Sequence, residues 1–113
     1  MSITYSNFFP ATVLGTTAGT LFTIGASPAS SLLRGGRIRF TNTTAAAVTV
    51  TAYNVPSGGT AAAGNAFVSA KSVNANDYVD VDVPIVPAGG FVQALAGSAT
   101  AITAHMLAGG VYS

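Results

Sequence analysis

The segment 77-DYVDVDVP-84 contains all three carboxylates of the chain, Asp77, Asp80 and Asp82. Clustered carboxylates can bind a divalent cation or act as a paired acid and base. Asp80 and Asp82 alternate with valines, so a strand would point both to one face, about 7 Å apart. A calcium loop needs further oxygen ligands and a glycine, and an acid–base pair needs two different environments. The alternation therefore favours solvated carboxylates over a metal or catalytic site.

Two arginines are the expected partners of these carboxylates. The segment 37-RIRFTNTT-44 also alternates, which places Arg37 and Arg39 on the face opposite its apolar residues. We expect structural ion pairs that join Arg37 and Arg39 to Asp80 and Asp82.

Other candidates for chemistry are weaker. His105 is the only histidine and cysteine is absent, so a zinc site lacks ligands, and a hydrolase would need His105 beside a distant serine and acid. The loop 59-GTAAAGN-65 approaches a phosphate-binding pattern but has Asn65 where that pattern has lysine. The sequon 42-NTT-44 has no secretion signal to give it a glycosylation context. We expect no enzyme, and no catalytic residue, metal ligand, cofactor or small-molecule substrate.

The composition points to packing against other proteins. The 113 residues suit one domain. Only 6% are charged, against about a quarter in typical domains, and the net charge of +1 gives no footprint for nucleic acid. The sequence predicts neither a signal peptide nor a membrane span. A neutral surface rich in Ala, Ser, Thr and Gly suits contact with copies of the chain or with another protein.

The chain alternates apolar and polar residues between turn signals about every ten residues, which predicts an all-β fold. Strands are expected at 20–25, 37–44, 46–55, 66–73, 78–83 and 91–97, and 98–113 is expected to contain a further strand and a C-terminal extended piece. The expected total is eight or nine short strands. A hairpin is expected between the strands at 37–44 and 46–55, through Asn42–Thr44. The predicted architecture is a single antiparallel β-sandwich, of which a jelly roll is one form. We expect an uncharged N-terminal arm with the first strands in 1–35 and the sandwich core in 36–113, as one domain overall.

Apolar or glycine-rich positions near chain ends and loop tips are the candidates for protein contact. Phe8 and Phe9 either seal the domain's own core or dock on a neighbouring subunit. The full set of contact candidates is Phe8, Phe9, Leu32, Leu33, Tyr53, Gly58 and Gly59.

The segments 40-FTNTTAAAVTVTAYNVPSGGTAAAGNAF-67 and 72-SVNANDYVDVDVPIVPAGGFVQALAGSATAITAHMLAGGVYS-113 resemble small structural proteins of tailed bacteriophages. The resemblance implies a compact β-sandwich and a virion component without catalytic residues. Within that class, a single small neutral domain favours a capsid decoration, or cement, protein on the outer capsid surface, made in the host cytoplasm. Its expected partners are the major capsid protein and copies of itself, as dimers or trimers, with no nucleic acid and no membrane.

The alternative is a structural module of the tail, neck or fibre, or a carbohydrate-binding sandwich. The carbohydrate-binding form would need an aromatic platform, to which Tyr5, Tyr53, Tyr78 and Tyr112 could contribute.

Overall fold

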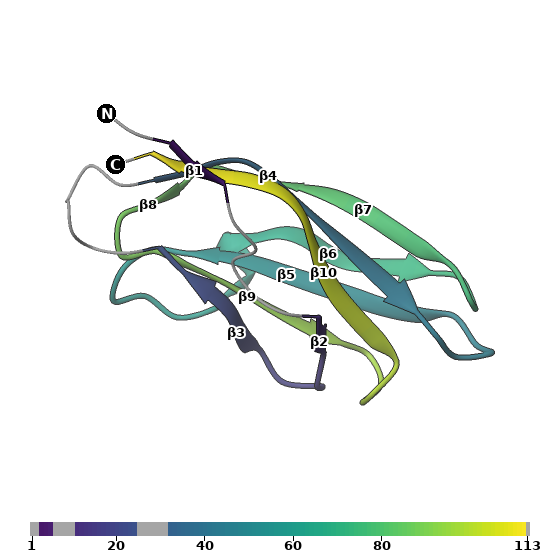
Figure 1. Ribbon diagram of the computed structural model, residues 1–113. Helices are drawn as coiled ribbons and strands as arrows, with labels where there is room; N and C mark the ends of the chain where they lie inside the picture. Colours follow the sequence, from purple (N-terminus) through teal and green to yellow (C-terminus); the bar gives the residue numbers. More distant parts are fainter. Residues whose placement is uncertain (1–2, 6–10, 25–31, 113) are drawn as a thin grey trace.

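The structure, a computed structural model, describes residues 3–5, 11–24 and 32–112. They form two antiparallel sheets that pack face to face (Figure 1). Sheet A contains β1 (Ile3–Tyr5), β2 (Thr12–Val13), β4 (Leu32–Asn42), β7 (Tyr78–Val83), β8 (Val86–Pro87) and β10 (Ile102–Tyr112). Sheet B contains β3 (Gly19–Thr23), β5 (Val48–Val55), β6 (Ala66–Val73) and β9 (Phe91–Ala96), and one 3-10 turn, η1 (Ala63–Asn65), precedes β6. The predicted all-β sandwich is confirmed.

The strand order is that of a jelly roll. Sheet A runs β1-β10-β4-β7, with β2 also pairing with β10, and sheet B runs β3-β9-β5-β6. Four antiparallel pairs, β2 with β10, β3 with β9, β4 with β7 and β5 with β6, join early strands to late ones. These pairs together form one long antiparallel ribbon that winds around the core. A ribbon of this kind contains two Greek keys, which is the jelly-roll topology.

The predicted hairpin between 37–44 and 46–55 is wrong. β4 pairs with β10 and β7 in sheet A, whereas β5 pairs with β6 and β9 in sheet B. The segment 43–47 therefore carries the chain from one sheet to the other. Alternation fixes which face of a strand is buried, but it does not choose the neighbouring strand.

The core lies between the sheets and follows the alternation of the strands. Ile38 and Phe40 of β4 are fully buried, as are Val50 and Ala52 of β5. Removing a side chain such as Phe40 from water contributes about 1.5–3 kcal/mol. The segment 11–24 also contributes to this core. Its buried side chains are Leu14, Leu21, Phe22 and Ile24.

One polar side chain is fully buried among the described residues, that of Asn42 at the end of β4. Its Nδ2 donates hydrogen bonds to the carbonyl oxygens of Ala46 (2.8 Å) and Val73 (3.0 Å). Its Oδ1 accepts from the backbone N–H (2.9 Å) and the hydroxyl (2.7 Å) of Thr44. Both amide protons and both acceptor sites are used, so the amide is buried without an unpaired atom.

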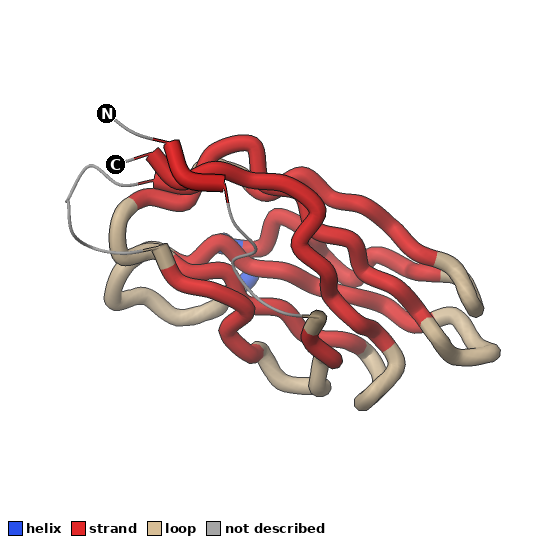
Figure 2. Tube along the Cα trace, in the orientation of Figure 1, coloured by secondary structure: helices blue, strands red, loops and turns tan. Residues whose placement is uncertain are grey.

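The Asn42 amide ties the crossover 43–47 to the end of β6. Backbone bonds extend the connection, because Thr43 N donates to Ala101 O and Asn76 N donates to Thr44 O. The turns 43–47, 74–77 and 97–101 gather at one end of the sandwich, on the right in Figure 2. Hydrogen bonds to a single buried side chain thus help to hold together the end where β4 leaves sheet A.

Replacing Asn42 with alanine is expected to lower the free energy of unfolding by about 3 kcal/mol, because the buried carbonyl of Val73 and the Thr44 N–H each lose a hydrogen bond to its side chain. Asn54→Ala is the matched control. The amide of Asn54 makes one exposed bond, Nδ2 to Ile85 O at 3.2 Å, so its loss should cost about 1 kcal/mol or less. Urea denaturation of both variants measures the difference. Equal decreases in the free energy of unfolding for the two variants would mean that the hydrogen bonds of Asn42 stabilise the fold no more than the exposed bond of Asn54.

Candidate functional site

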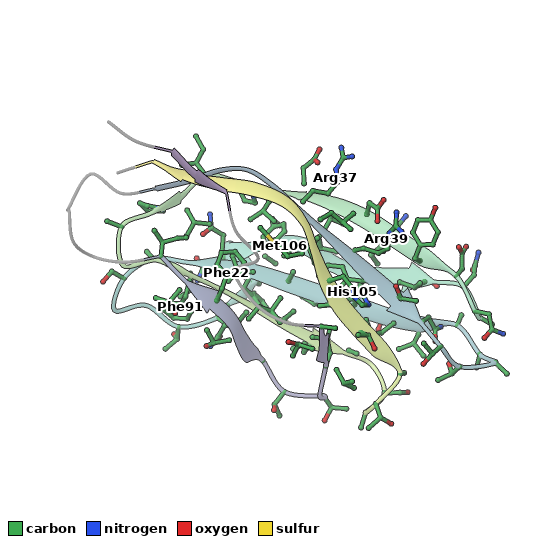
Figure 3. All side chains as sticks on the ribbon, viewed as in Figure 1. Phe22, Arg37, Arg39, Phe91, His105 and Met106 are labelled. Atoms are coloured by element: carbon green, nitrogen blue, oxygen red, sulfur yellow. The ribbon has the colours of Figure 1, made fainter. Side chains whose placement is uncertain are left out.

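The outer face of sheet A gathers most of the charged side chains that the structure describes. Arg37 and Arg39 of β4 lie opposite Asp82 and Asp80 of β7. Their neighbours Ile38 and Phe40 point into the core, so the arginines point away from sheet B, as Figure 3 shows. His105 of β10 lies opposite Arg39 on its other side. We call the five residues Arg37, Arg39, Asp80, Asp82 and His105 the charged face.

The pair formed by Arg39 and Asp80 is the tighter of two ion pairs. Arg39 Nε and Nη2 donate to the two oxygens of Asp80 at 2.7 and 3.0 Å, a bidentate arrangement that fixes both groups. The guanidinium carbon also lies 4.0 Å from the centroid of the Tyr78 ring, a cation–π contact. The hydrogen bond from Arg39 holds the pKa of Asp80 below its ordinary value, although desolvation opposes the shift. The same bond raises the pKa of Arg39.

Arg37 and Asp82 form the second, looser ion pair. Arg37 Nε donates to Asp82 Oδ1 at 3.1 Å, and the two side chains are 54% and 82% exposed. Those of Arg39 and Asp80 are 37% and 28% exposed. Since exposed pairs are screened by water and salt, the Arg37 pair adds little stability. Both ion pairs expected from the sequence are present.

The arrangement of the charged face orders His105, Arg39 and Asp80 as one row across β10, β4 and β7. Arg39 stands between the histidine and the carboxylate, and both oxygens of Asp80 accept hydrogen bonds from it. An acid that orients a catalytic histidine would bond to the imidazole directly. Among the described residues, no group of three or more His, Cys, Asp or Glu side chains could hold a metal ion. Within this row, the Arg39–Asp80 pair joins β4 to β7.

The contact candidates from the sequence are dispersed. Phe8 and Phe9 lie outside the described residues. Leu32 and Leu33 belong to β4, where they pair with Pro87 and Val86 of β8. Tyr53 is half-buried and pairs with Gln93, on sheet B.

Gly58 and Gly59 form a tight turn that follows β5. Gly59 N donates to Pro56 O at 2.9 Å, and Gly58 has a φ of +77°, which glycine adopts without strain. A Cβ at Gly59 would lie 3.1 Å from Pro56 O. The geometry of the turn therefore accounts for both glycines.

The described tyrosines do not form one aromatic platform. Tyr53 belongs to β5 of sheet B, whereas Tyr78 belongs to β7 of sheet A, and Arg39 covers the Tyr78 ring. The side chains of Tyr5 and Tyr112 lie outside what the structure describes.

The described residues contain no helix with the length and hydropathy of a membrane span.

The structural role of Asn42, a buried and fully hydrogen-bonded side chain, was not predicted from the sequence. A signal was available, because Asn42 follows Ile38 and Phe40 at two-residue spacing and so falls on the buried face of β4. Because the Asn42 side chain is fully buried and hydrogen-bonded, the 42-NTT-44 sequon is not accessible for glycosylation in the folded protein.

No protein-family model and no curated protein matches the chain. In solved structures, the fold is similar to a chain in the structure of infectious bursal disease virus Gx strain, with a TM-score of 0.53 and 15% sequence identity. The match covers 97% of this chain and 31% of that chain, so the protein spans about a third of the length of its structural neighbour. At this identity the likeness concerns the fold.

The stability that Asp80 provides should depend on pH. Its pKa is depressed below 3.8 in the folded state, so its contribution is fully present above the unfolded value and is lost as the pH falls through the folded one. Asp80→Asn should therefore unfold with a weaker pH dependence below about pH 4 than the wild type. Asp82→Asn removes the carboxylate of the longer and more exposed ion pair, so the stability of this control variant should differ less from that of the wild type at each pH. Denaturation at pH 7, 4 and 2 tests this, and identical pH profiles for Asp80→Asn and wild type would contradict it.

Proposed function

We propose that this protein is a non-enzymatic structural protein of a virus particle, and specifically a decoration protein on the capsid of a tailed bacteriophage. Its partners would be the major capsid protein and further copies of itself. It would lie on the outer surface of the shell after synthesis in the host cytoplasm. The shared fold with a chain of a virus structure supports the virion part of the proposal. The decoration role on a tailed bacteriophage rests on the resemblance of the segments 40–67 and 72–113 and on the small, neutral domain.

The jelly roll supports a structural role, since viral capsid domains commonly use it. The fold encloses a hydrophobic core in a small chain, because early strands pair with late ones. A domain of this kind presents two broad sheet faces and two loop ends for contact. Because lectin domains share the architecture, the fold by itself does not select the partner, and surface chemistry must contribute to the choice.

The surface chemistry favours a protein partner. Only 6% of the residues are charged, and Arg37, Arg39, Asp80 and Asp82 are already paired within the chain. The outer face of sheet B presents Thr51, Tyr53, Gln93 and Leu95, all half-buried and uncharged. Desolvating such groups costs less than desolvating unpaired charges.

A shell offers the same contact many times. Weak contacts that repeat over a lattice gain stability from multivalency when copies of the decoration protein are linked to one another. A small neutral domain is therefore sufficient to reinforce a shell against internal pressure.

Heating particles assembled with and without this protein tests the role in stabilisation. Particles that carry it should release their contents at a higher temperature, because each bound copy stabilises the assembled state by mass action. A light-scattering or dye-release melt measures the shift, and adding the purified protein back to the deficient particles should restore it. Equal disruption temperatures, with no protein bound to the shell, would refute the decoration role.

A further inference from the structure

Among the strands that the structure describes, β7 is the last of sheet A, and none of them pairs with its outer edge. β7 pairs with β4 through six residues without a register shift, from Tyr78 opposite Thr41 to Val83 opposite Gly36. Asn42 N donates to Asp77 O, which fixes the alternation of the ladder. The backbone groups of Val79, Val81 and Val83 therefore face β4, and those of Tyr78, Asp80 and Asp82 face away from it.

The other described strands at the sheet ends offer poorer templates. β6 has two register shifts, and Ala70 within it has a φ of +48° and donates its N–H to Thr51 Oγ1 at 3.0 Å. β3 is interrupted between Thr20 and Phe22, and β1 and β2 have three and two residues. Bulges and shortness protect an edge, as do charged side chains and proline. β7 is neither bulged nor short, and its protection consists of the carboxylates of Asp80 and Asp82 and of Pro84 at its end.

The side chains along β7 define what an added strand must carry. Asp80 and Asp82 lie on the outer face, where Asp82 is 82% exposed. Val79 and Val81 point the other way and are half-buried against the core, as are Phe67 and Val68 of β6. An added strand would place alternate side chains beside the carboxylates and beside these apolar groups.

Exposed apolar side chains mark both ends of this edge. Tyr78 at its start is 51% exposed, and Ile85, just after its end, is 59% exposed. They are two of the four large exposed hydrophobic side chains in the described part of the chain. Both would lose contact with water if a strand lay along the edge.

We propose that the open edge of β7 accepts a β-strand from another protein, and that this strand alternates basic and apolar residues. Backbone hydrogen bonds to Asp80 and Asp82 give affinity. Charge complementarity with the carboxylate of Asp82, which is 82% exposed and only loosely paired with Arg37, selects the partner. The chain's own β4, with Arg37, Ile38 and Arg39, satisfies the same pattern on the other side of β7. The proposal concerns this edge and does not require the virion role.

A second copy of the chain fits this edge less well than a basic strand. If two β7 strands paired antiparallel about Val81, Asp80 of one copy would lie opposite Asp82 of the other. Like charges directly opposite on adjacent strands are destabilising. The occupant is therefore a partner strand that brings positive charge.

A peptide titration of the full chain tests the proposal. The probe is a nine-residue peptide of alternating lysine and valine with acetylated and amidated ends, and the control peptide has glutamate in place of each lysine. Amide NMR signals of residues 78–83 and of Ile85 should shift with the lysine peptide, which should bind at least about tenfold more tightly than the glutamate peptide. The absence of shifts at millimolar peptide, or equal binding of the two peptides, would overturn the proposal.

Two variants at one position separate the backbone contact from the charge. Asp82→Ala keeps the outward N–H, whereas Asp82→Pro removes it without removing a hydrogen bond to β4. Proline should weaken binding about tenfold relative to alanine, and equal affinity in two folded variants would refute strand addition. If Asp82→Pro does not fold, the two-peptide comparison on the wild-type chain decides. Shifts of the same signals with protein concentration alone would identify a second copy as the occupant and overturn the proposal.

Discussion

The buried amide of Asn42 is the constraint on which the arrangement of the sandwich depends. The chain leaves sheet A at Asn42 and enters sheet B at Val48, and this crossing lets β10 and β7 flank β4. Without the four bonds of the Asn42 side chain, its own buried amide would have no partners and the buried carbonyl of Val73 would lose a hydrogen bond. A buried polar group whose hydrogen bonds are all made favours one strand arrangement, because alternative strand pairings would leave the group without partners.

Much of the local structure could be predicted from the sequence, and the reason is visible in β4 and β7. Strict alternation placed Ile38 and Phe40 inside and the arginines outside, and it placed Asp80 and Asp82 on the matching face. The strand partners could not be read in the same way, because a short polar joint fits both a hairpin and a crossover. The register shift between Met106 and Ala108 also has no signature in an alternating pattern, since it depends on the neighbouring strand.

The two sheets differ in the chemistry that they present. Sheet A has the charged face, in which the carboxylates of β7 are held by arginines of β4, and sheet B presents uncharged side chains such as Thr51 and Gln93. Among the described residues, paired charges thus join β4 to β7 in sheet A, whereas sheet B carries a single charged side chain, Lys71 of β6. The contact positions expected from sequence composition are less well defined, because Gly58 and Gly59 are explained by their turn and Phe8 and Phe9 lie outside the described residues.

The copy number per purified particle tests most directly whether this sandwich belongs to the shell of a virus particle, as proposed. Quantitative mass spectrometry against the major capsid protein, with a reconstruction of the particle, would give both number and position. A decoration protein that follows the shell lattice should be present in hundreds of copies, on the order expected for repeated contacts. About six or twelve copies at a symmetric neck or tail would contradict the decoration role, and no copies would contradict the virion role altogether.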